Sequence, residues 1–380
     1  MNKEITMPSP PSAWEDLNKE QLVFIHSLNR AEMPPFVFKT RVFLELCGLE
    51  LCGKSYYEEP SSDKADIASI EKLVQWIEDM LNNKLPATIV LRKKGDKDEK
   101  EPLMAISSKN LFEAIDYFTE FLDNPFTLID CKIGSIQIGQ HTYAGPDPML
   151  LSLTYEQYQN AQSALTGIAF IQDSLRRKNE SVLKKIQSSS IDVSKASEQE
   201  ITTLIGASNI EEMKKEELSL KESQGDFLAA VLCLKELKET EYEQYDSRGQ
   251  LVTDAEGMPI RKKTSFWQRR KYDSEEMQRL RDELIEFAPT WLFPLLYQWF
   301  QSSLIALQGK FPKLFRDNKA AGEENDPVKA FAQTLNTIMK EQGFSSQRNV
   351  LSTEAVLNFE TLNRLATQAE ELERINKKNR

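Results

Sequence analysis

The sequence is poor in the residues that most often carry catalysis and metal binding. It has only two histidines and four cysteines among its 380 residues. Histidine supplies much of the acid-base chemistry near neutral pH and many metal ligands. With two histidines, the chain has few residues for a histidine-based catalytic or metal site. We expect His26 to lie at the surface or boundary of a helix. We expect His141, with Asp130 and Asp147 nearby in the sequence, to be structural or solvated.

The cysteines are spaced irregularly along the chain. Cys47 and Cys52 are too far apart for a CxxC redox pair, and Cys131 and Cys233 do not add the second pair that a zinc site needs. We therefore expect Cys47 and Cys52 to pack within helices, and we expect neither a metal site nor a cofactor. The first residues have no apolar leader, which together with the cysteine usage favours a reduced, cytoplasmic protein.

Catalytic signatures are missing as well. The sequence has no GxxxxGK(S/T) loop, no GxSxG elbow and no GxGxxG after a strand. Carboxylates are plentiful, but pairs such as Asp282 with Glu283 lie among Lys and Arg, which favours exposed ion pairs. We therefore expect a protein that is not an enzyme. An unfamiliar carboxylate site, gathered from residues far apart in the sequence, is an alternative that stays open.

Uncharged apolar runs are rare, and one of them bears on membrane insertion. Residues 287–309 contain no charge and are about as long as a bilayer span. Pro289 and Pro294 interrupt the early part of this run, and five Gln and Ser side chains would be poorly satisfied in hydrocarbon. We therefore predict a buried core helix and no membrane span.

The charge balance is acidic, with one basic cluster. The chain has 59 acidic and 48 basic residues and a net charge of −11, which disfavours a general binder of phosphate backbones. The basic cluster surrounds Phe266 and Trp267, an interleaving that suits nucleic acid or an acidic protein. Its members are Arg261, Lys262, Lys263, Arg269, Arg270 and Lys271. Nucleic acid is the less favoured ligand, because residues 273–286 beside it are acidic.

Apolar periodicity predicts a mainly helical α+β protein. Residues recurring three or four apart indicate helices. The expected helical ranges are 13–28, 36–51, 66–83, 110–124, 155–177, 227–245, parts of 267–315 and 352–380. Compact apolar runs predict a small β portion near 88–143, and two glycine turns predict a peripheral hairpin at 246–262. Thr154 is expected to cap the helix that follows it.

The length of the chain predicts more than one domain. A flexible N-terminus is expected first, then a helical module with the β portion, then a charged linker or insert rich in Ser, Lys and Glu. A second helical module and a loop with polar terminal helices complete the expected order. The ranges are 1–12, 13–178, 179–223, 224–318 and 319–380.

Large apolar side chains in polar surroundings are candidates for contact with other proteins. We name Trp14, Leu17, Tyr155, Tyr158, Trp267 and Trp299. Most of the aromatic side chains around Trp299 are expected to fill a helical core, with one or two left for a partner. The oligomeric state is left open.

Three passages resemble proteins encoded beside tail genes in phages and prophages of Bacteroidota. They are SAWEDLNKEQLVFI at 12–25, LLSLTYEQYQNAQ at 150–162 and VLSTEAVLNFETLNRLATQAEE at 350–371. The resemblance is to tail-assembly chaperones and virion-morphogenesis proteins. It implies a non-enzymatic role in the host cytoplasm, with tail or other virion proteins as partners. The alternative is a nucleic-acid-associated accessory protein of a mobile element that uses the basic cluster.

Overall fold

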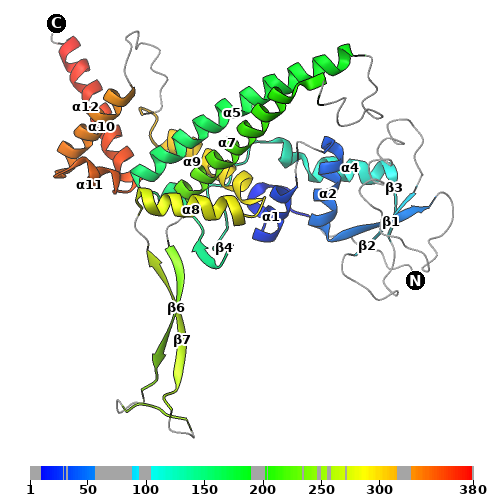
Figure 1. Ribbon diagram of the computed structural model, residues 1–380, viewed down its shortest axis with the longest axis horizontal. Coiled ribbons are helices and arrows are strands. Elements are labelled where there is room, and N and C mark those ends of the chain that lie inside the picture. The colour runs from blue at the N-terminus through cyan, green and yellow to red at the C-terminus, as the bar shows by residue number, and fades with distance from the viewer. Residues whose placement is uncertain are drawn as a thin grey trace. The chain divides into compact units, whose positions relative to one another are not determined.

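The computed structural model places the chain in two compact units. It describes residues 10–28, 30, 33–55, 88–93, 104–189, 202, 204–232, 235–245, 250–254, 258–269, 272–314 and 327–378. The first unit comprises Met1–Leu128 with Thr290–Ser302, and the second comprises Ile129–Pro289 with Ser303–Arg380. Figure 1 labels the elements of both.

The first unit combines helices with a three-stranded antiparallel sheet. Its helices are η1 (Trp14–Asp16), α1 (Lys19–Ser27), α2 (Pro35–Cys47), α4 (Ser108–Phe118) and η4 (Glu120–Asp123), and its strands are β1 (Leu49–Ser55), β2 (Thr88–Lys93) and β3 (Met104–Ser107). The strand order is β1-β2-β3. The Asn18 side chain caps α1, and Gly48, in the left-handed region at φ 62°, ends α2.

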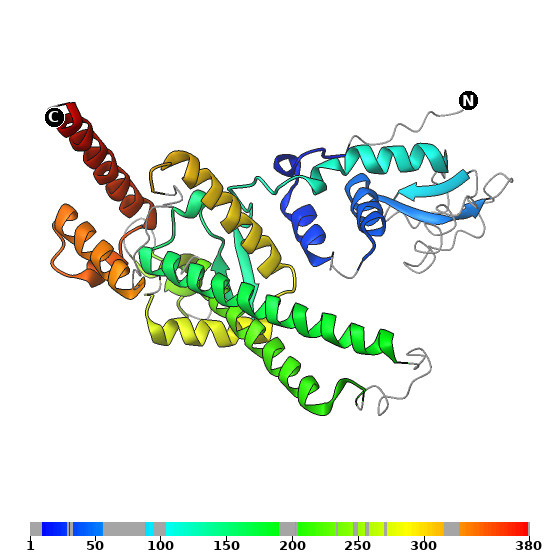
Figure 2. The same ribbon diagram turned by 90° about the horizontal axis from the view of Figure 1, so that it is seen from above.

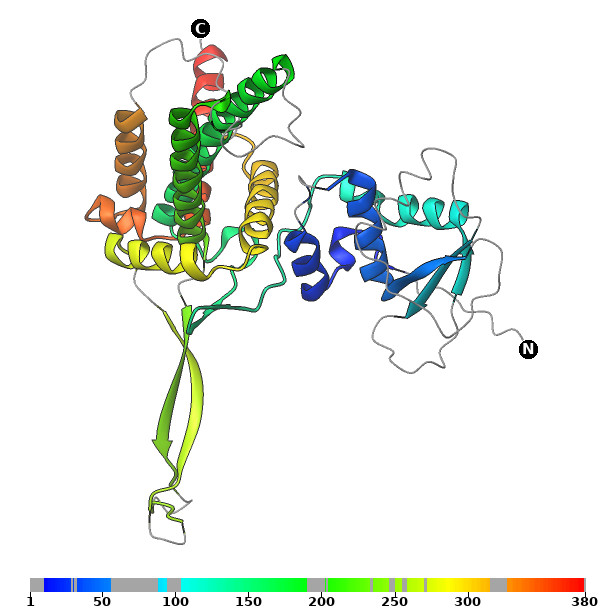
Figure 3. The same ribbon diagram turned by 45° about the vertical axis from the view of Figure 1, so that its right-hand side comes forward.

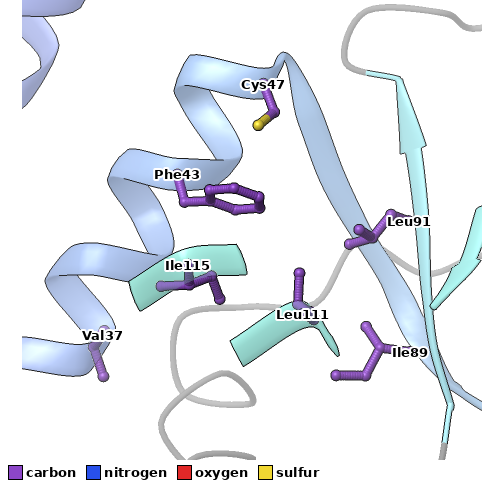
Figure 4. Packing of buried hydrophobic residues seen from close by; sticks show 7 residues of the cluster. All are labelled: Val37, Phe43, Cys47, Ile89, Leu91, Leu111 and Ile115. Atoms are coloured by element: carbon purple, nitrogen blue, oxygen red, sulfur yellow. The ribbon is translucent and has the colours of Figure 1, made fainter. Parts of the chain in front are cut away.

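Helices α2 and α4 bury their apolar sides against the sheet (Figure 4). Two side chains of β2, Ile89 and Leu91, point to the helices, as alternation along a strand requires. The rest of this cluster is Val37, Phe43, Cys47, Leu111 and Ile115. Burial raises the pKa of the Cys47 thiol to about 12, so this thiol packs as an apolar group.

Helix α9 (Leu292–Lys310) contains the uncharged run noted above. Most of its apolar side chains are buried, as predicted, although Tyr297 and Ile305 are exposed. The buried ones include Leu292, Leu295, Leu296, Trp299, Phe300 and Leu307. No helix of the described ranges is long and apolar enough to cross a membrane.

The second unit is built around a pair of long helices. Helix α5 (Tyr155–Ser188) and helix α7 (Ala207–Val231) pack side by side (Figure 2). Thr154 caps α5 with a capping box: its hydroxyl accepts from the Gln157 amide at 3.2 Å. Helix α8 (Ser274–Phe287) packs on α7. The remaining elements are η5 (Pro148–Leu150), α10 (Pro327–Gln342), α11 (Gln347–Leu351) and α12 (Ala355–Lys378).

A four-stranded antiparallel sheet completes the second unit. It comprises β4 (Ser135–Ile138), β5 (His141–Ala144), β6 (Lys235–Glu243) and β7 (Arg261–Arg269), in that order. Strand β5 meets β6 at a single pair, Tyr143 with Glu236. Beyond that pair β6 and β7 continue alone and extend away from the helices of the unit (Figures 1 and 3).

The mainly helical α+β class is confirmed, and so are the hairpin of β2 with β3 and the short strands β4 and β5. The helix expected over 66–83 lies outside the described residues, as do most of the predicted N-terminus and the loop at 319–326. The predicted domain ranges stay predictions. They differ from the two units because the first stretch of the first unit ends at Leu128 and this unit also includes the first part of α9, up to Ser302.

Three predictions about secondary structure are wrong. The helix over 36–51 ends at Cys47, and Cys52 lies in β1 rather than in a helix. The described residues of the predicted linker over 179–223 are mostly helical, because α5 continues to Ser188 and α7 starts at Ala207. Lys178 holds these two helices together with Nζ 3.0 Å from both Glu212 and Glu216. The charges that suggested a loose linker therefore pair between the two helices.

The third error concerns residues 227–245, which were expected to be one helix. The helix ends at Val231, and β6 begins at Lys235. Glutamate, lysine and leucine favour helices by propensity, but nine antiparallel pairs with β7 override that preference. The predicted hairpin over 246–262 is therefore only the outer part of a much longer one.

Candidate interaction site

The outstanding surface feature of the second unit is the ribbon formed by β6, β7 and the residues between them, here called the arm (residues 235–269). Nine residues of β6 pair with nine of β7, from Lys235 with Arg269 to Glu243 with Arg261. At about 3.4 Å per residue these strands extend about 30 Å. Figure 3 shows the arm leaving the helices of its unit.

Side-chain pairs across the arm explain why these two segments form strands. Near the outer end, acidic residues of β6 lie opposite basic residues of β7: Glu241 faces Lys263 at 3.9 Å, and Glu243 is opposite Arg261. Thr240 is opposite Thr264 on the base side of these pairs, a β-branched pair that suits a pleated ribbon. Each pair contributes a few tenths of a kcal/mol to about 1 kcal/mol.

The described residues at the tip of the arm form two isolated bridges. Tyr245 forms a bridge with Leu251, and Thr253 forms one with Pro259. Val252 lies between them: its amide donates to the Gln244 carbonyl at 2.8 Å, and its carbonyl accepts from the Ile260 amide at 2.9 Å. These hydrogen bonds give the tip a defined backbone.

The arm carries a concentration of exposed apolar side chains. Of the 19 large apolar side chains exposed in the described residues, seven lie in the arm. They are Tyr242, Tyr245, Leu251, Met258, Ile260, Phe266 and Trp267. Adjacent side chains on a strand point to opposite faces, so Phe266 and Trp267, 48% and 42% exposed, give each face of the ribbon an aromatic ring. Such a concentration makes the arm a candidate binding surface.

Charge is segregated between the two strands. Strand β6 has four glutamates and two lysines, whereas β7 has four basic residues and no acidic one. Over the whole arm, seven basic residues balance seven acidic residues. The arm is therefore electrically neutral as a whole and dipolar across its width.

A network of hydrogen bonds and ion pairs anchors the base of the arm. His141 Nδ1 on β5 lies 2.7 Å from Glu236 Oε1 on β6. The Tyr143 hydroxyl donates to Glu283 of α8 at 3.0 Å, and Arg279 Nη1 donates to the same carboxylate at 2.9 Å. Burial raises the pKa of Tyr143, so this hydroxyl stays protonated as a donor. His141 is structural, as predicted, but its partners are glutamates rather than Asp130 or Asp147.

Five of the six side chains predicted to contact partners are packed inside the units. They are Trp14, Leu17, Tyr155, Tyr158 and Trp299, each no more than 9% exposed. The Trp14 ring lies 5.1 Å from Phe121 in an edge-on contact, and the Tyr158 ring lies 4.9 Å from Phe359. Helix packing covers these five side chains, so they are not available for contact with another protein. Trp267 alone is exposed.

His26 is also placed differently from the prediction. It is buried rather than at a helix surface, with Nδ1 2.8 Å from the Leu22 carbonyl and Nε2 3.0 Å from the Gln298 amide. Burial lowers the pKa of His26, although both hydrogen bonds act in the opposite direction. These two hydrogen bonds explain how an imidazole is accommodated inside the unit.

The structure describes only part of the basic cluster. Arg261, Lys262 and Lys263 are exposed along β7. Arg269 ends the strand, while Arg270 and Lys271 lie outside the described residues. The described part of the cluster is therefore one basic strand beside an acidic one rather than a uniformly basic patch.

Sequence reasoning missed the other apolar residues of the arm. Tyr242 alternates with Glu241 and Glu243, and Thr240 with Glu239 and Glu241, which is the period of two expected for a strand. That alternation was the available signal, and the helix propensity of the same residues concealed it. Leu251, Met258 and Ile260 carry no such pattern in the sequence.

A second surface feature is a polar hollow on the first unit. Its lining residues are Lys39, Glu113, Asp116, Tyr117, Glu120 and Asp123. Lys39 Nζ lies 2.6 Å from Asp123 and 3.3 Å from Asp116, and its hydrogen bond to Asp123 raises the pKa of Lys39. The lysine thus neutralises part of the acidic lining. Within the described ranges, no group of three His, Cys, Asp or Glu side chains is arranged to hold a metal ion.

Comparison of the chain with protein-family models, with curated proteins and with solved structures gave no match. The geometry of the arm is therefore the main basis for a functional proposal.

Proposed function

We propose that this chain is a non-enzymatic protein-binding factor that contacts other proteins through the arm. The observation that carries the proposal is the exposure of seven large apolar side chains on one neutral ribbon. Tyrosine and tryptophan give large contact areas at small cost in side-chain entropy, and they are frequent at interface hot spots. The arm already has its backbone in place, which lowers the cost of binding further.

The finer proposal is a role as a tail-assembly chaperone or virion-morphogenesis protein in the cytoplasm of the host cell. The passages at 12–25, 150–162 and 350–371 that resemble such proteins support it. An exposed ribbon with aromatic rings on both faces suits a client that has apolar surface before it assembles. The expected partners are tail or other virion proteins.

The test is capture from the native host. Tagged full-length chain is recovered at moderate salt with nuclease present, and the proteins that accompany it are identified by mass spectrometry. Two variants are compared with the natural chain. The double variant Phe266→Ala and Trp267→Ala removes the exposed rings of β7. The control variant Phe170→Ala removes an exposed ring of α5, which is 77% exposed and outside the arm.

Virion proteins in stoichiometric amount with the natural chain and the control, and their loss with the double variant, would support the proposal. Recovery of the chain alone, or equal capture by the double variant, would contradict it. Circular dichroism and the free energy of unfolding of the double variant should remain close to those of the natural chain, because the lost side chains are exposed.

A second candidate function is that of an accessory protein that binds nucleic acid. Arg261, Lys262 and Lys263 are exposed beside Phe266 and Trp267, and ribbons of this composition can lie against nucleic acid. The acidic strand β6 opposes such binding. The second function requires affinity that falls steeply with salt and is lost when the three basic residues are replaced by Gln. Binding that ignores salt would reject it.

A further inference from the structure

We propose that the arm also pairs with the arm of a second copy of this chain, β7 of one copy lying antiparallel beside β6 of the next. This inference rests on the proposed function only in that the arm is the interacting element. It assigns the two edges of the ribbon to self-assembly and leaves its aromatic faces to the client protein.

Both edges of the arm are available for pairing. Among the described strands, β7 is the last of its sheet, and no described strand lies on its outer side. On the other side, β5 pairs with β6 only where Tyr143 meets Glu236, so the outer edge of β6 is uncovered from Leu237 onward. An exposed strand edge is a template for another strand, which proteins commonly block with charge.

The charges on the arm block one kind of pairing and favour another. Placing β7 beside the β7 of another copy would bring basic residues together, and placing β6 beside another β6 would bring glutamates together. Pairing β7 with β6 joins the strand without acidic residues to the strand with four glutamates. The segregation of charge therefore selects unlike edges of two copies.

The residue pairs of the arm show how the next copy would fit. Within one arm Glu241 is opposite Lys263, and Glu243 is opposite Arg261. If a second arm lies beside the first in the same register and direction, each of these glutamates has a basic residue on both sides. Opposite charges at neighbouring positions stabilise a sheet, and like charges destabilise it.

Nearer the base of the arm, a row of apolar side chains across the strands supports the same register. Leu237 is opposite Trp267 in the arm, and repetition in the next copy would extend that row with a second Leu and Trp. Trp267 is 42% exposed in the single chain, so the neighbour would cover part of its ring. Because the two edges differ, the contact is head to tail and leads to a ring or an open filament.

The experiment measures self-association of the full chain by sedimentation velocity at low and high salt. The natural chain is expected to form oligomers that weaken as salt rises. The variant Arg261→Glu with Lys263→Glu places glutamates opposite the glutamates of β6 at two positions, Glu243 and Glu241, and should weaken self-association about tenfold or more. A chain that stays monomeric at every concentration and at low salt would overturn the proposal.

Loss of oligomers in that variant can also come from a damaged arm, because the same substitutions place acidic residues against β6 of their own chain. A four-residue exchange controls for this. The variant Glu241→Lys, Glu243→Lys, Arg261→Glu and Lys263→Glu keeps opposite charges within the arm and between identical copies. It should assemble as the natural chain does.

The decisive experiment mixes the four-residue variant with the natural chain. The exchanged variant should form oligomers with itself but not with the natural chain, because every mixed contact brings like charges together. Native mass spectrometry of the mixture should therefore show two separate populations. Free mixing would overturn the proposal, as would oligomers that survive the two-residue reversal.

The same reversed variant separates this inference from the proposed function. The two-residue variant Arg261→Glu with Lys263→Glu retains Phe266 and Trp267. Where its circular dichroism and unfolding match those of the natural chain, its arm is intact, and it should still capture client proteins even when self-association is lost. Loss of self-association together with retained capture supports edge pairing. The Phe266→Ala and Trp267→Ala variant gives the converse result. If it still self-associates but no longer captures client proteins, edge pairing is supported and the faces of the arm are the client site.

Discussion

Trp299 in α9 and Trp267 in β7 each lie directly beside a phenylalanine in the sequence, yet their environments in the folded chain are opposite. Trp299 is fully buried, and Trp267 is 42% exposed. A helix can bury much of its surface when other elements pack around it, whereas a two-stranded ribbon has no second layer to cover its faces. The architecture around an aromatic residue, rather than the residue itself, decides between core and contact surface.

The most severe way to test this contrast is to truncate both tryptophans. Trp299→Ala should lower the free energy of unfolding by about 3–5 kcal/mol, because it leaves a large cavity. Trp267→Ala should change it by less than about 1 kcal/mol, since the ring lies on an exposed ribbon. Denaturant titration of both variants measures the difference. Equal losses would show that the arm is part of the core.

Two glycines test the small sheet at the base of the arm. A side chain at Gly145 would place Cβ 1.6 Å from the Ile133 carbonyl oxygen, whereas one at Gly134 meets nothing within 4 Å. Gly145→Ala should therefore lower the free energy of unfolding by about 3 kcal/mol, and Gly134→Ala should hardly change it. Thermal unfolding of the pair provides the measurement. A neutral Gly145→Ala would mean that this backbone can move apart freely.

A buried glutamine tests the helical part of the second unit. Gln157 Nε2 donates to the carbonyls of Ala230 at 3.1 Å and of Leu232 at 3.3 Å, which fixes the start of α5 to the end of α7. Gln157→Ala should destabilise by about 1–3 kcal/mol, because buried carbonyls lose their donor. The matched variant is Gln172→Ala at an exposed position of α5. Similar unfolding curves for the two variants would show that the Gln157 side chain does not fix α5 to α7.

The smallest expected effect is a pH dependence of the first unit. Burial lowers the pKa of His26 from its ordinary value of 6.5, so the folded chain binds fewer protons than the unfolded chain just below that pH. The free energy of unfolding should fall as pH drops through 6.5, by at most about 1.4 kcal/mol per pH unit, and level off below the folded pKa.

The variant His26→Gln isolates that contribution. Unfolding is followed from pH 7.5 to pH 5.5 in the natural chain and in the variant. The variant should lose stability at neutral pH and show a shallower slope below about pH 6.5. An unchanged slope would mean that other groups cause the pH dependence.

Much of the fold could be predicted from apolar spacing. The buried helix α9, the cap at Thr154 and the hairpin of β2 with β3 all follow from local patterns. These elements have strong periodicity or a recognisable cap. Local reasoning suits such elements.

The candidate site was only partly predictable. The basic residues Arg261 to Lys263 and the exposed Trp267 were identified from composition. Strand β6 was missed because its Glu and Lys favour a helix locally, while its pairing partner lies some twenty residues away. The buried tyrosines Tyr155 and Tyr158 were taken for surface residues because burial depends on contacts with α12, which no local pattern reveals.

Contact between the arm and other proteins is tested most directly by site-specific photo-cross-linking in the native host. A photoreactive phenylalanine analogue replaces Phe266 in one sample and Phe170, an exposed residue of α5, in another. The account predicts discrete cross-linked products from position 266 and few from position 170. Products from position 170 alone, or from neither position while the chain is captured with partners, would contradict it.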